Sequence, residues 1–336
     1  MRTTTAWQST GGSTVLDRVT IERRDLRADD VAVRIDYCGV CHTDLHSIHG
    51  AEGRVVPGHE FTGVVAEVGA DVTEHAVGDR VAVGTIIDSC GTCAMCVAGQ
   101  EPYCFEGVTL TYGPSTDGGY SREYVLRADF VHALPDGLDP VTAAPLLCAG
   151  ISVYQPLKAA GVKPGDRVGV AGLGGLGHLA VKFAAAMGAE VTMLSRTADK
   201  VADAERLGAS GLLLTTDEAA LAEARGSFDV IIDTIPVQHD VGPFLRLVGL
   251  DGTVSVVGHL GSLDLAVMDL LAGRKRLTSS GVGGRPDTRE MLAFAAEHGV
   301  SADVELLPSA QVGEALERLE AGDVRYRFVL DLSDLD

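Results

Sequence analysis

The sequence has little of what membrane proteins and nucleic-acid-binding proteins need. None of its 336 residues lie in an apolar run that approaches 18 residues, the length at which a transmembrane helix becomes a candidate. The segment Met1 to Trp7 lacks the apolar core of a signal peptide. Lys and Arg number 27 against 47 Asp and Glu, a net charge of −20, whereas phosphate backbones attract clustered cations. We expect a cytoplasmic protein that binds neither membrane nor nucleic acid.

Aromatic residues and cysteines are also scarce. Aromatics make up 5% of the chain, Trp7 is its one tryptophan, and there are seven cysteines. In the cytoplasm we expect these cysteines to be thiols or metal ligands rather than disulfides. The chain does have 46% hydrophobic residues and 41 glycines. Its length allows two domains, each with a substantial core.

The pattern of the chain changes near residue 163. Before it, short strands separated by Gly, Asp and Pro are expected at 31–35, 61–68 and 80–83. After it, strands alternate with helical stretches, which implies a parallel sheet covered on both faces. These later strands are expected at 167–171, 190–194, 211–214, 228–233 and 253–257. A helix at 287–297 and a strand at 326–330 follow, so the α/β part is expected to be an insertion into a discontinuous first domain.

Four cysteines form one local cluster. Cys90, Cys93, Cys96 and Cys104 give the pattern C-x2-C-x2-C-x7-C, and four thiolates so close in sequence can wrap one structural zinc ion. Four buried free thiols are the ordinary alternative, but cysteine is scarce elsewhere in the chain. An iron–sulfur cluster is the other alternative, because C-x2-C-x2-C begins the bacterial ferredoxin pattern. That pattern continues with x3-Cys-Pro, whereas here seven residues intervene and Phe105 follows. The spacing favours zinc.

Three further features can supply ligands to a second metal. They are the segment Cys38-Gly-Val-Cys-His-Thr-Asp-Leu-His46, the triplet Gly58-His-Glu60, and Cys148. Each alone has an ordinary explanation: a redox-active cysteine pair, a surface or core histidine, or a packed cysteine. Together they can provide two cysteines and one histidine with an open fourth position, which is the catalytic zinc arrangement of alcohol dehydrogenases.

A glycine-rich turn follows the strand at 167–171. It consists of Gly172, Leu173, Gly174, Gly175, Leu176 and Gly177, which fits G-x-G-x-x-G. Such glycines permit a tight turn and a close approach of backbone to pyrophosphate, and the helix that follows offers unpaired N–H donors. Its placement between a strand and a helix predicts a dinucleotide site.

Taken together, these motifs resemble the medium-chain, zinc-dependent alcohol dehydrogenase family, in its cinnamyl alcohol dehydrogenase-like branch. The resemblance runs nearly end to end and includes Pro57-Gly-His-Glu60, Ala144-Pro-Leu-Leu-Cys-Ala-Gly150 and Asp323-Val-Arg-Tyr-Arg-Phe-Val329. It implies an α/β chain in which a GroES-like β-rich catalytic domain holds an inserted Rossmann domain. The implied boundaries are 1–149 for the first catalytic part, with a structural zinc lobe at about 88–106. Residues 150–284 are then the NADP-binding domain, and 285–336 the return segment.

The resemblance also assigns residues of the reaction. It implies that Cys41, His59 and Cys148 bind the catalytic zinc, that Glu60 can approach that metal, and that Cys38 is a buried structural thiol. Thr43 matches the hydroxyl that touches the substrate oxygen, and His46 matches the next member of a proton relay. The acidic residue that often follows in this branch falls near Ala51. The relay therefore ends in either Glu52 or water.

The end of the second strand of the α/β part indicates which cofactor is used. NAD enzymes place an acidic residue there for the ribose diol, but this strand ends in Ser195, Arg196 and Thr197, with Lys200 one turn later. Hydroxyls and two cations suit a 2′-phosphate, whereas the ordinary alternative is a solvated Arg196. We expect NADP(H).

The resemblance implies further cofactor contacts and an assembly. The additional cofactor residues are His42, Thr234, Gly258 and Ser280. Two zinc ions per chain, a small aldehyde or alcohol substrate, and a homodimer paired through the nucleotide domains are expected. The tryptophan that borders the pocket in this branch falls near Thr109 or Leu110, and a phenylalanine position falls near Gly281. The alternatives are an NADPH-dependent reductase of iminium or conjugated C=C bonds, or a non-enzymatic zinc- and NADPH-binding protein.

Overall fold

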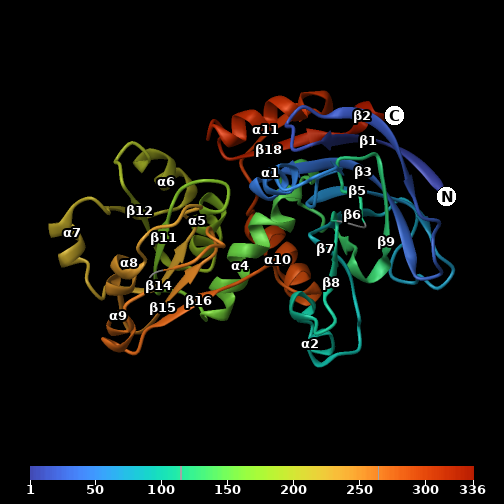
Figure 1. Cartoon of the computed structure of the whole chain (residues 1–336). Helices are drawn as coiled ribbons and strands as arrows, with labels where there is room; N and C mark the ends of the chain where they lie inside the picture. Colours follow the sequence, from blue (N-terminus) through green and yellow to red (C-terminus); the bar gives the residue numbers. More distant parts are fainter. Residues whose placement is uncertain (114–115, 264) are drawn as a thin grey trace. The chain divides into compact units, whose positions relative to one another are not determined.

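The computed structural model describes residues 1–113, 116–263 and 265–336 (Figure 1). The chain divides into two compact units. Unit 1 comprises Met1–Cys148 and Gly283–Asp336, and unit 2 comprises Ala149–Val282. Within the described residues, no helix is long and apolar enough to cross a membrane.

Unit 1 is built around a 7-stranded sheet that is largely antiparallel. The path runs β10-β6-β5-β3-β18-β17, and β9 pairs with β3 off this path. The strands are β3 (Asp30–Val40), β5 (Phe61–Val68), β6 (Arg80–Val83), β9 (Glu123–Arg127), β10 (His132–Ala133), β17 (Val304–Pro308) and β18 (Arg327–Asp331). The strands expected at 31–35, 61–68 and 80–83 are confirmed. The final strand begins one residue later than expected.

Smaller elements surround this sheet. A 3-stranded sheet contains β1 (Arg2–Thr10), β2 (Asp17–Arg23) and β4 (Arg54–Val55), and a 2-stranded sheet pairs β7 (Ile86–Ser89) with β8 (Val108–Leu110). The helices of unit 1 are α1 (His42–His49), α2 (Ala94–Val97), α3 (Pro140–Ala143), α10 (Arg285–His298) and α11 (Val312–Glu320). Alternating apolar residues of β3, β5 and β18 enter one shared core, in which Val33, Phe61 and Phe328 are fully buried.

The core edge of unit 1 also buries a histidine. His132 lies in β10 and is 5% exposed, and its Nδ1 atom has no hydrogen-bond partner among the described residues. Burial is the main reason why the pKa of His132 is lowered to about 3, and the positive charge of Arg289 contributes to this shift. The folded state therefore holds this ring in its neutral form.

Unit 2 contains a 6-stranded parallel sheet in the order β13-β12-β11-β14-β15-β16. Renumbered within the unit this order is 3-2-1-4-5-6, the doubly wound arrangement of dinucleotide-binding domains. The strands are β11 (Arg167–Ala171), β12 (Glu190–Ser195), β13 (Gly211–Leu214), β14 (Phe228–Asp233), β15 (Val248–Val256) and β16 (Arg276–Ser279). The helices are α4 (Ala149–Ala159), α5 (Gly177–Ala186), α6 (Val201–Leu207), α7 (Glu218–Glu223), α8 (Gly242–Leu247) and α9 (Val267–Leu271). The parallel sheet is confirmed, and β16 is a strand that the sequence pattern did not predict.

Candidate metal centres and cofactor site

Three side chains from distant parts of unit 1 meet at one point. Cys41 directly precedes α1, His59 directly precedes Glu60 and β5, and Cys148 is the last residue of the first segment of unit 1. Their ligand atoms all lie within 4.8 Å of one another, and the two sulfurs are 4.0 Å apart. His59 Nε2 is buried and has no hydrogen-bond partner among the described residues. An orphaned imidazole nitrogen beside two thiols fits a zinc ion.

Asp44 fixes the orientation of the His59 ring. The Asp44 carboxylate is fully buried and lies 3.0 Å from His59 Nδ1, which leaves Nε2 for the metal. It also accepts the backbone N–H of Cys41 at 2.9 Å and that of Gly58 at 3.0 Å. Burial lowers the pKa of His59, but the Asp44 carboxylate outweighs burial and raises it well above the ordinary value. Asp44 lies inside the Cys38–His46 segment, whose sequence alone indicates no role for it. In the structure Asp44 lies at N3 of the helix that begins after Cys41, and its carboxylate caps the Cys41 backbone N–H.

Glu60 is held back by an arginine from the other end of the chain. Arg327 of β18 is buried and pairs with Glu60 Oε1, while Glu60 Oε2 has no partner within the described structure. Burial acts to raise the pKa of Glu60, whereas the positive charge of the adjacent Arg327 opposes this and favours the carboxylate. Gly39 of β3 makes room for this pair, because a Cβ atom there would lie 2.5 Å from Glu60 Oε1. Glu60 thus lies next to the candidate metal site, and its carboxylate is bound by Arg327.

Thr43 and His46 lie on one exposed face of α1, three residues apart. Thr43 Oγ1 is 3.6 Å from the Cys41 sulfur, so its hydroxyl lies beside the candidate metal site. Tyr112 braces this turn by donating its hydroxyl to the Thr43 carbonyl at 3.1 Å, and its ring packs edge-on against His59. In the described part of the chain His46 has no carboxylate partner, so the structure adds no acid to the relay.

The four-cysteine lobe of unit 1 has the geometry of a single-ion site. The ligand atoms of Cys90, Cys93, Cys96 and Cys104 lie within 4.8 Å of one another, and three sulfur–sulfur distances are 3.6, 3.8 and 3.9 Å. A tetrahedron with Zn–S bonds of about 2.3 Å has sulfurs about 3.8 Å apart. An iron–sulfur cluster would hold the cysteine sulfurs further apart, because iron and sulfide lie between them. The residues fit zinc.

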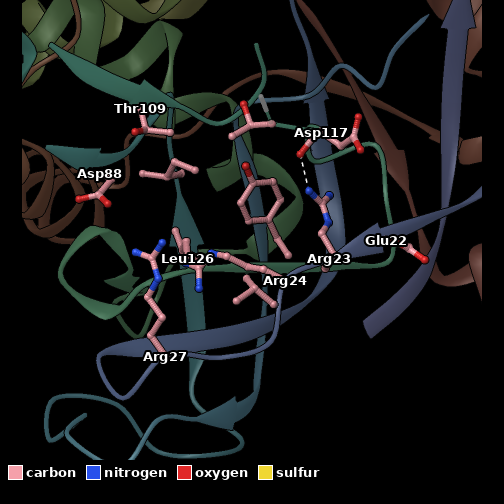
Figure 2. Close-up of a pocket in the computed structure, with 12 residues that line it drawn as sticks. Glu22, Arg23, Arg24, Arg27, Asp88, Thr109, Asp117 and Leu126 are labelled. Carbon is pink, nitrogen blue, oxygen red and sulfur yellow. Dashed lines mark hydrogen bonds between the residues drawn. The ribbon is translucent and has the colours of Figure 1, made fainter. Parts of the chain in front are cut away.

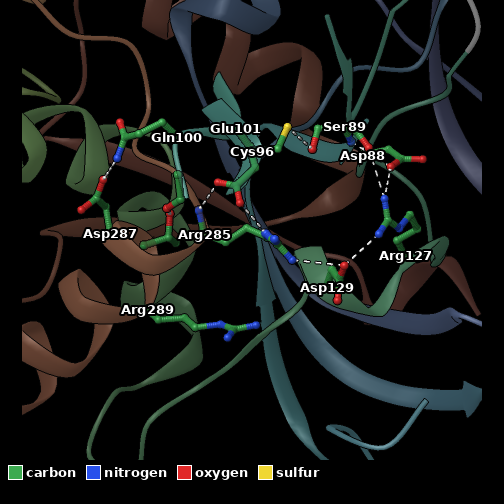
Figure 3. A network of polar contacts seen from close by, with 12 residues as sticks. Asp88, Ser89, Cys96, Gln100, Glu101, Arg127, Asp129, Arg285, Asp287 and Arg289 are labelled. Carbon is green, nitrogen blue, oxygen red and sulfur yellow. Dashed lines mark hydrogen bonds and ion pairs between the residues drawn. The ribbon is translucent and has the colours of Figure 1, made fainter. Parts of the chain in front are cut away.

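Hydrogen bonds and ion pairs tie this lobe to the start of α10 (Figure 3). Glu101 is 1% exposed, and its carboxylate accepts the backbone N–H of Arg285 at 3.0 Å and its Nε at 2.7 Å. Arg285 also reaches Asp129 at 3.1 Å, and Asp129 in turn pairs with Arg127 at 2.8 Å. A Cβ atom at Gly284 would lie 1.9 Å from the Gly99 carbonyl oxygen. The lobe therefore packs closely against the first turn of the return segment.

In unit 2 the glycine-rich turn has the expected local geometry. Gly172 has φ +89°, and a Cβ at Gly177 would lie 1.9 Å from the Gly172 carbonyl oxygen, so neither position tolerates a side chain. Thr234, after β14, donates its hydroxyl to Ala171 O at 2.8 Å, and Gly258 packs on its backbone. The predicted residues of the glycine-rich turn, together with Thr234 and Gly258, thus gather at the carboxyl edge of the sheet, where α/β sheets bind ligands.

The remaining predicted cofactor residues lie on separate elements. Ser195 ends β12, and Arg196 and Lys200 follow it, with no ion pair for either cation within the described residues. Thr197 bonds Asp199 through its hydroxyl. Ser280 donates its hydroxyl to Gln155 at 2.5 Å, within unit 2. His42 lies in α1 of unit 1.

A surface pocket of unit 1 is a different feature (Figure 2). It is lined by residues of β2, β7, β8 and β9 and of adjoining loops, including Arg23, Arg24 and Thr109, and by none of the predicted zinc ligands. Two of its three arginines already have structural partners: Arg23 donates to three backbone carbonyls, and Arg24 pairs with Asp30. We assign it no part in the candidate site.

Comparisons with known proteins agree with this geometry. Residues 27–136 match the alcohol dehydrogenase GroES-like domain, and residues 175–297 match the zinc-binding dehydrogenase family. The chain is 47% identical to a probable formaldehyde dehydrogenase of Bacillus subtilis, over 95% of both chains. It is 45% identical to an NADP-dependent alcohol dehydrogenase C of Mycolicibacterium smegmatis, over 100% of this chain and 99% of that protein.

Solved structures give the same result. A cinnamyl alcohol dehydrogenase from Sorghum bicolor superposes with a TM-score of 0.95 at 42% identity, covering 100% of this chain and 99% of its own. A CAD from Helicobacter pylori, complexed with NADP(H), has a TM-score of 0.91 at 32% identity and 99% coverage of both chains. The chain belongs to the zinc-dependent medium-chain alcohol dehydrogenase family, in its cinnamyl alcohol dehydrogenase-like branch.

Proposed function

We propose that this chain is a zinc-dependent, NADP(H)-linked alcohol dehydrogenase or aldehyde reductase, which transfers hydride between NADP(H) and a small alcohol or aldehyde. The observation that carries the proposal is the convergence of Cys41, His59 and Cys148, with His59 Nε2 buried and left without a protein partner. Two cysteines and one histidine leave a fourth position for substrate. NADP(H) use is supported by the residues after β12, where two cations replace the acid of NAD enzymes.

When bound, zinc supplies Lewis-acid polarisation of the aldehyde carbonyl and NADPH supplies the hydride. The side chains of the chain do the rest. Asp44 orients His59, and Thr43 Oγ1 donates a proton to the substrate oxygen as it gains negative charge. His46, on the same face of α1, re-supplies that proton, with Glu52 or water beyond it. Such proton transfer contributes about 10²–10⁴-fold to a rate.

The cofactor residues are proposed in the same way. The backbone of Gly172, Leu173, Gly174, Gly175, Leu176 and Gly177 would bind the pyrophosphate at the start of α5. The side chains of Ser195, Arg196, Thr197 and Lys200 would bind the 2′-phosphate. His42, Thr234, Gly258 and Ser280 are the further contacts. The zinc of the four-cysteine lobe is proposed to be structural, and Glu60 to be a transient neighbour of the catalytic metal.

The surface of unit 2 supports the proposed homodimer. β16 is an edge strand, and edge strands offer unpaired backbone groups to a partner. The adjacent α9 exposes three apolar side chains, Val267, Met268 and Leu271, each at least 65% accessible. A dimer paired through this unit would cover both, and light scattering of the purified protein tests it. Cytoplasmic location and the boundaries 1–149, 150–284 and 285–336 stay proposals as well.

An NADPH-oxidation screen over aliphatic and aromatic aldehydes tests the activity, with metal content measured on the same preparation. We expect turnover and two zinc ions per chain. Cys148→Ser should abolish turnover in a protein that still folds, whereas Cys93→Ser should mainly lower stability. The intact set of Cys41, His59, Cys148 and Thr43 disfavours the iminium or C=C reductase and the non-enzymatic binding protein. Absence of turnover with every aldehyde, in protein that holds both zincs, would overturn the proposal.

A further inference from the structure

Tyr120 is a fully buried tyrosine whose hydroxyl points at the carboxylate that orients His59. The side chain is 0% exposed, and its hydroxyl donates to Asp44 Oδ2 at 3.1 Å. A phenylalanine would fill the same space without that hydrogen bond. Packing alone does not account for the hydroxyl. A buried polar atom needs a hydrogen-bond partner, and here that partner is the carboxylate beside the candidate metal site.

The hydroxyl completes the set of donors around Asp44. Oδ1 accepts from Gly58 N and faces His59 Nδ1, both at 3.0 Å, while Oδ2 accepts from Cys41 N at 2.9 Å and from Tyr120. A carboxylate has about four lone-pair sites, so every site is used. Without the Tyr120 donor, Oδ2 would keep a single partner, and the carboxylate plane would be fixed on one side only.

The backbone around Tyr120 holds the ring rigidly beside His59. Tyr120 N donates to Pro57 O at 2.9 Å, and its carbonyl accepts Trp7 N at 2.8 Å. Gly58 has φ +98°, and a Cβ atom there would lie 2.6 Å from Tyr120 Cδ1. The ring therefore lies directly against the residue that precedes His59. These contacts fix the position of Tyr120 independently of Asp44, so its hydroxyl can hold the Asp44 carboxylate in place.

We propose that Tyr120 is a positioning residue of the catalytic metal site, which it serves by locking Asp44 so that His59 Nε2 faces Cys41 and Cys148. This inference rests on the proposed function, because it assumes that those three side chains bind zinc. Partners beyond the direct ligands alter metal affinity by about 10–100-fold. Tyr120 acts through one intermediate residue, so we expect an effect at the lower end, about 10-fold.

Zinc release measures this effect without reference to turnover. Zinc-loaded protein is mixed with excess chelator, and release is followed with a metallochromic dye, giving one phase for each site. Cys148→Ser identifies the catalytic phase by its absence. Tyr120→Phe should accelerate that phase about 10-fold and leave the phase of the four-cysteine lobe unchanged. The unchanged lobe phase also reports that the variant has folded.

Tyr124→Phe is the matched control. Tyr124 is 2% exposed, lies in the same unit, and donates its hydroxyl to the Thr111 carbonyl rather than to Asp44. It should change neither phase. A catalytic phase that is unchanged or slower in Tyr120→Phe would overturn the inference, as would an equal acceleration in Tyr124→Phe.

A double-mutant cycle tests the route through Asp44. In an Asp44→Asn background, Tyr120→Phe should have little further effect, because the carboxylate that it holds is gone. A full 10-fold acceleration in that background would show that Tyr120 acts elsewhere and would overturn the inference. Failure of the proposed function looks different: the wild-type protein would hold one zinc, or Cys148→Ser would lose no phase.

Discussion

Replacement of Gly39 even by alanine should lower the stability of unit 1, because an added Cβ atom would occupy space that the Glu60 side chain fills. A Cβ atom there would lie 2.5 Å from Glu60 Oε1, 2.7 Å from Cδ and 2.9 Å from Cγ. The main chain cannot give way, since Gly39 N donates to Glu60 O at 2.8 Å and β3 pairs with β18. The Glu60 side chain must therefore move off Arg327, which is buried and pairs with it.

Separating a buried ion pair lowers stability by about 3–5 kcal/mol when one charge loses its partner. Glu60 can swing rather than vanish, so we take about 3 kcal/mol for Gly39→Ala. Unit 1 has about 200 residues, and at that size about 2–4 °C is lost per kcal/mol. The melting transition of unit 1, followed by calorimetry, should fall by about 6–12 °C.

Gly53→Ala is the control for Gly39→Ala. Gly53 also lies in unit 1, its φ is not positive, and an added Cβ meets nothing within 4 Å. Its substitution should leave the transition within about 2 °C of wild type, as expected for an open surface position. If Gly39→Ala also melts within about 2 °C of wild type, the Glu60 side chain can move without cost, and its pairing with Arg327 does not stabilise unit 1.

Three further predictions concern cofactor choice, proton transfer and acid stability. NADPH should be preferred over NADH at least tenfold in catalytic efficiency, because charge-assisted phosphate contacts contribute about 1.5–3 kcal/mol each. The double variant Ser195→Asp with Arg196→Ala should shift the preference toward NADH. Equal catalytic efficiencies with the two cofactors in the wild-type protein would refute this prediction. Thr43→Ala should lower turnover by about 10²-fold or more with NADPH affinity unchanged, and His46→Ala should lower turnover less. Steady-state kinetics across pH measures both effects. Near wild-type turnover in Thr43→Ala would show that Thr43 is not the proton donor. The pKa of His132 is lowered to about 3 in the folded protein, so above pH ~6.5 the ring is neutral in both the folded and the unfolded state. As pH falls from there toward 3, the unfolded state takes up the proton first, and the free energy of unfolding decreases by about 1.4 kcal/mol per pH unit. His132→Gln should flatten this acid limb in unfolding measured between pH 4 and 8, and an unchanged slope would count against the buried neutral ring.

The parts of the site that sequence could predict are those that are local. The four cysteines of the lobe lie within 15 residues, so their spacing alone indicated one metal. The glycine-rich turn likewise takes its meaning from the strand before it and the helix after it. By contrast, Cys41 and Cys148 are 107 positions apart, and only the resemblance to a family selected Cys41 rather than Cys38 as the ligand beside Cys148.

The contacts that sequence could not predict depend on sheet register. Arg327 meets Glu60 across 267 positions, and Tyr120 meets Asp44 across 76. Neither pair has a spacing signal, because each depends on how β18 and the loop before β9 lie against β3 and α1. β16 was missed for another reason: it has four residues, mostly exposed, and no alternating apolar pattern.

The most direct test of the central claim is the product formed from a conjugated enal and NADPH. If Cys41, His59 and Cys148 hold zinc as proposed, the metal would polarise the carbonyl group, and the carbonyl carbon would be the favoured site for the hydride. The expected product is therefore the allylic alcohol, and the reaction should be lost when zinc is removed and recover when zinc is returned. Formation of the saturated aldehyde instead, or an undiminished rate in zinc-free protein, would contradict it.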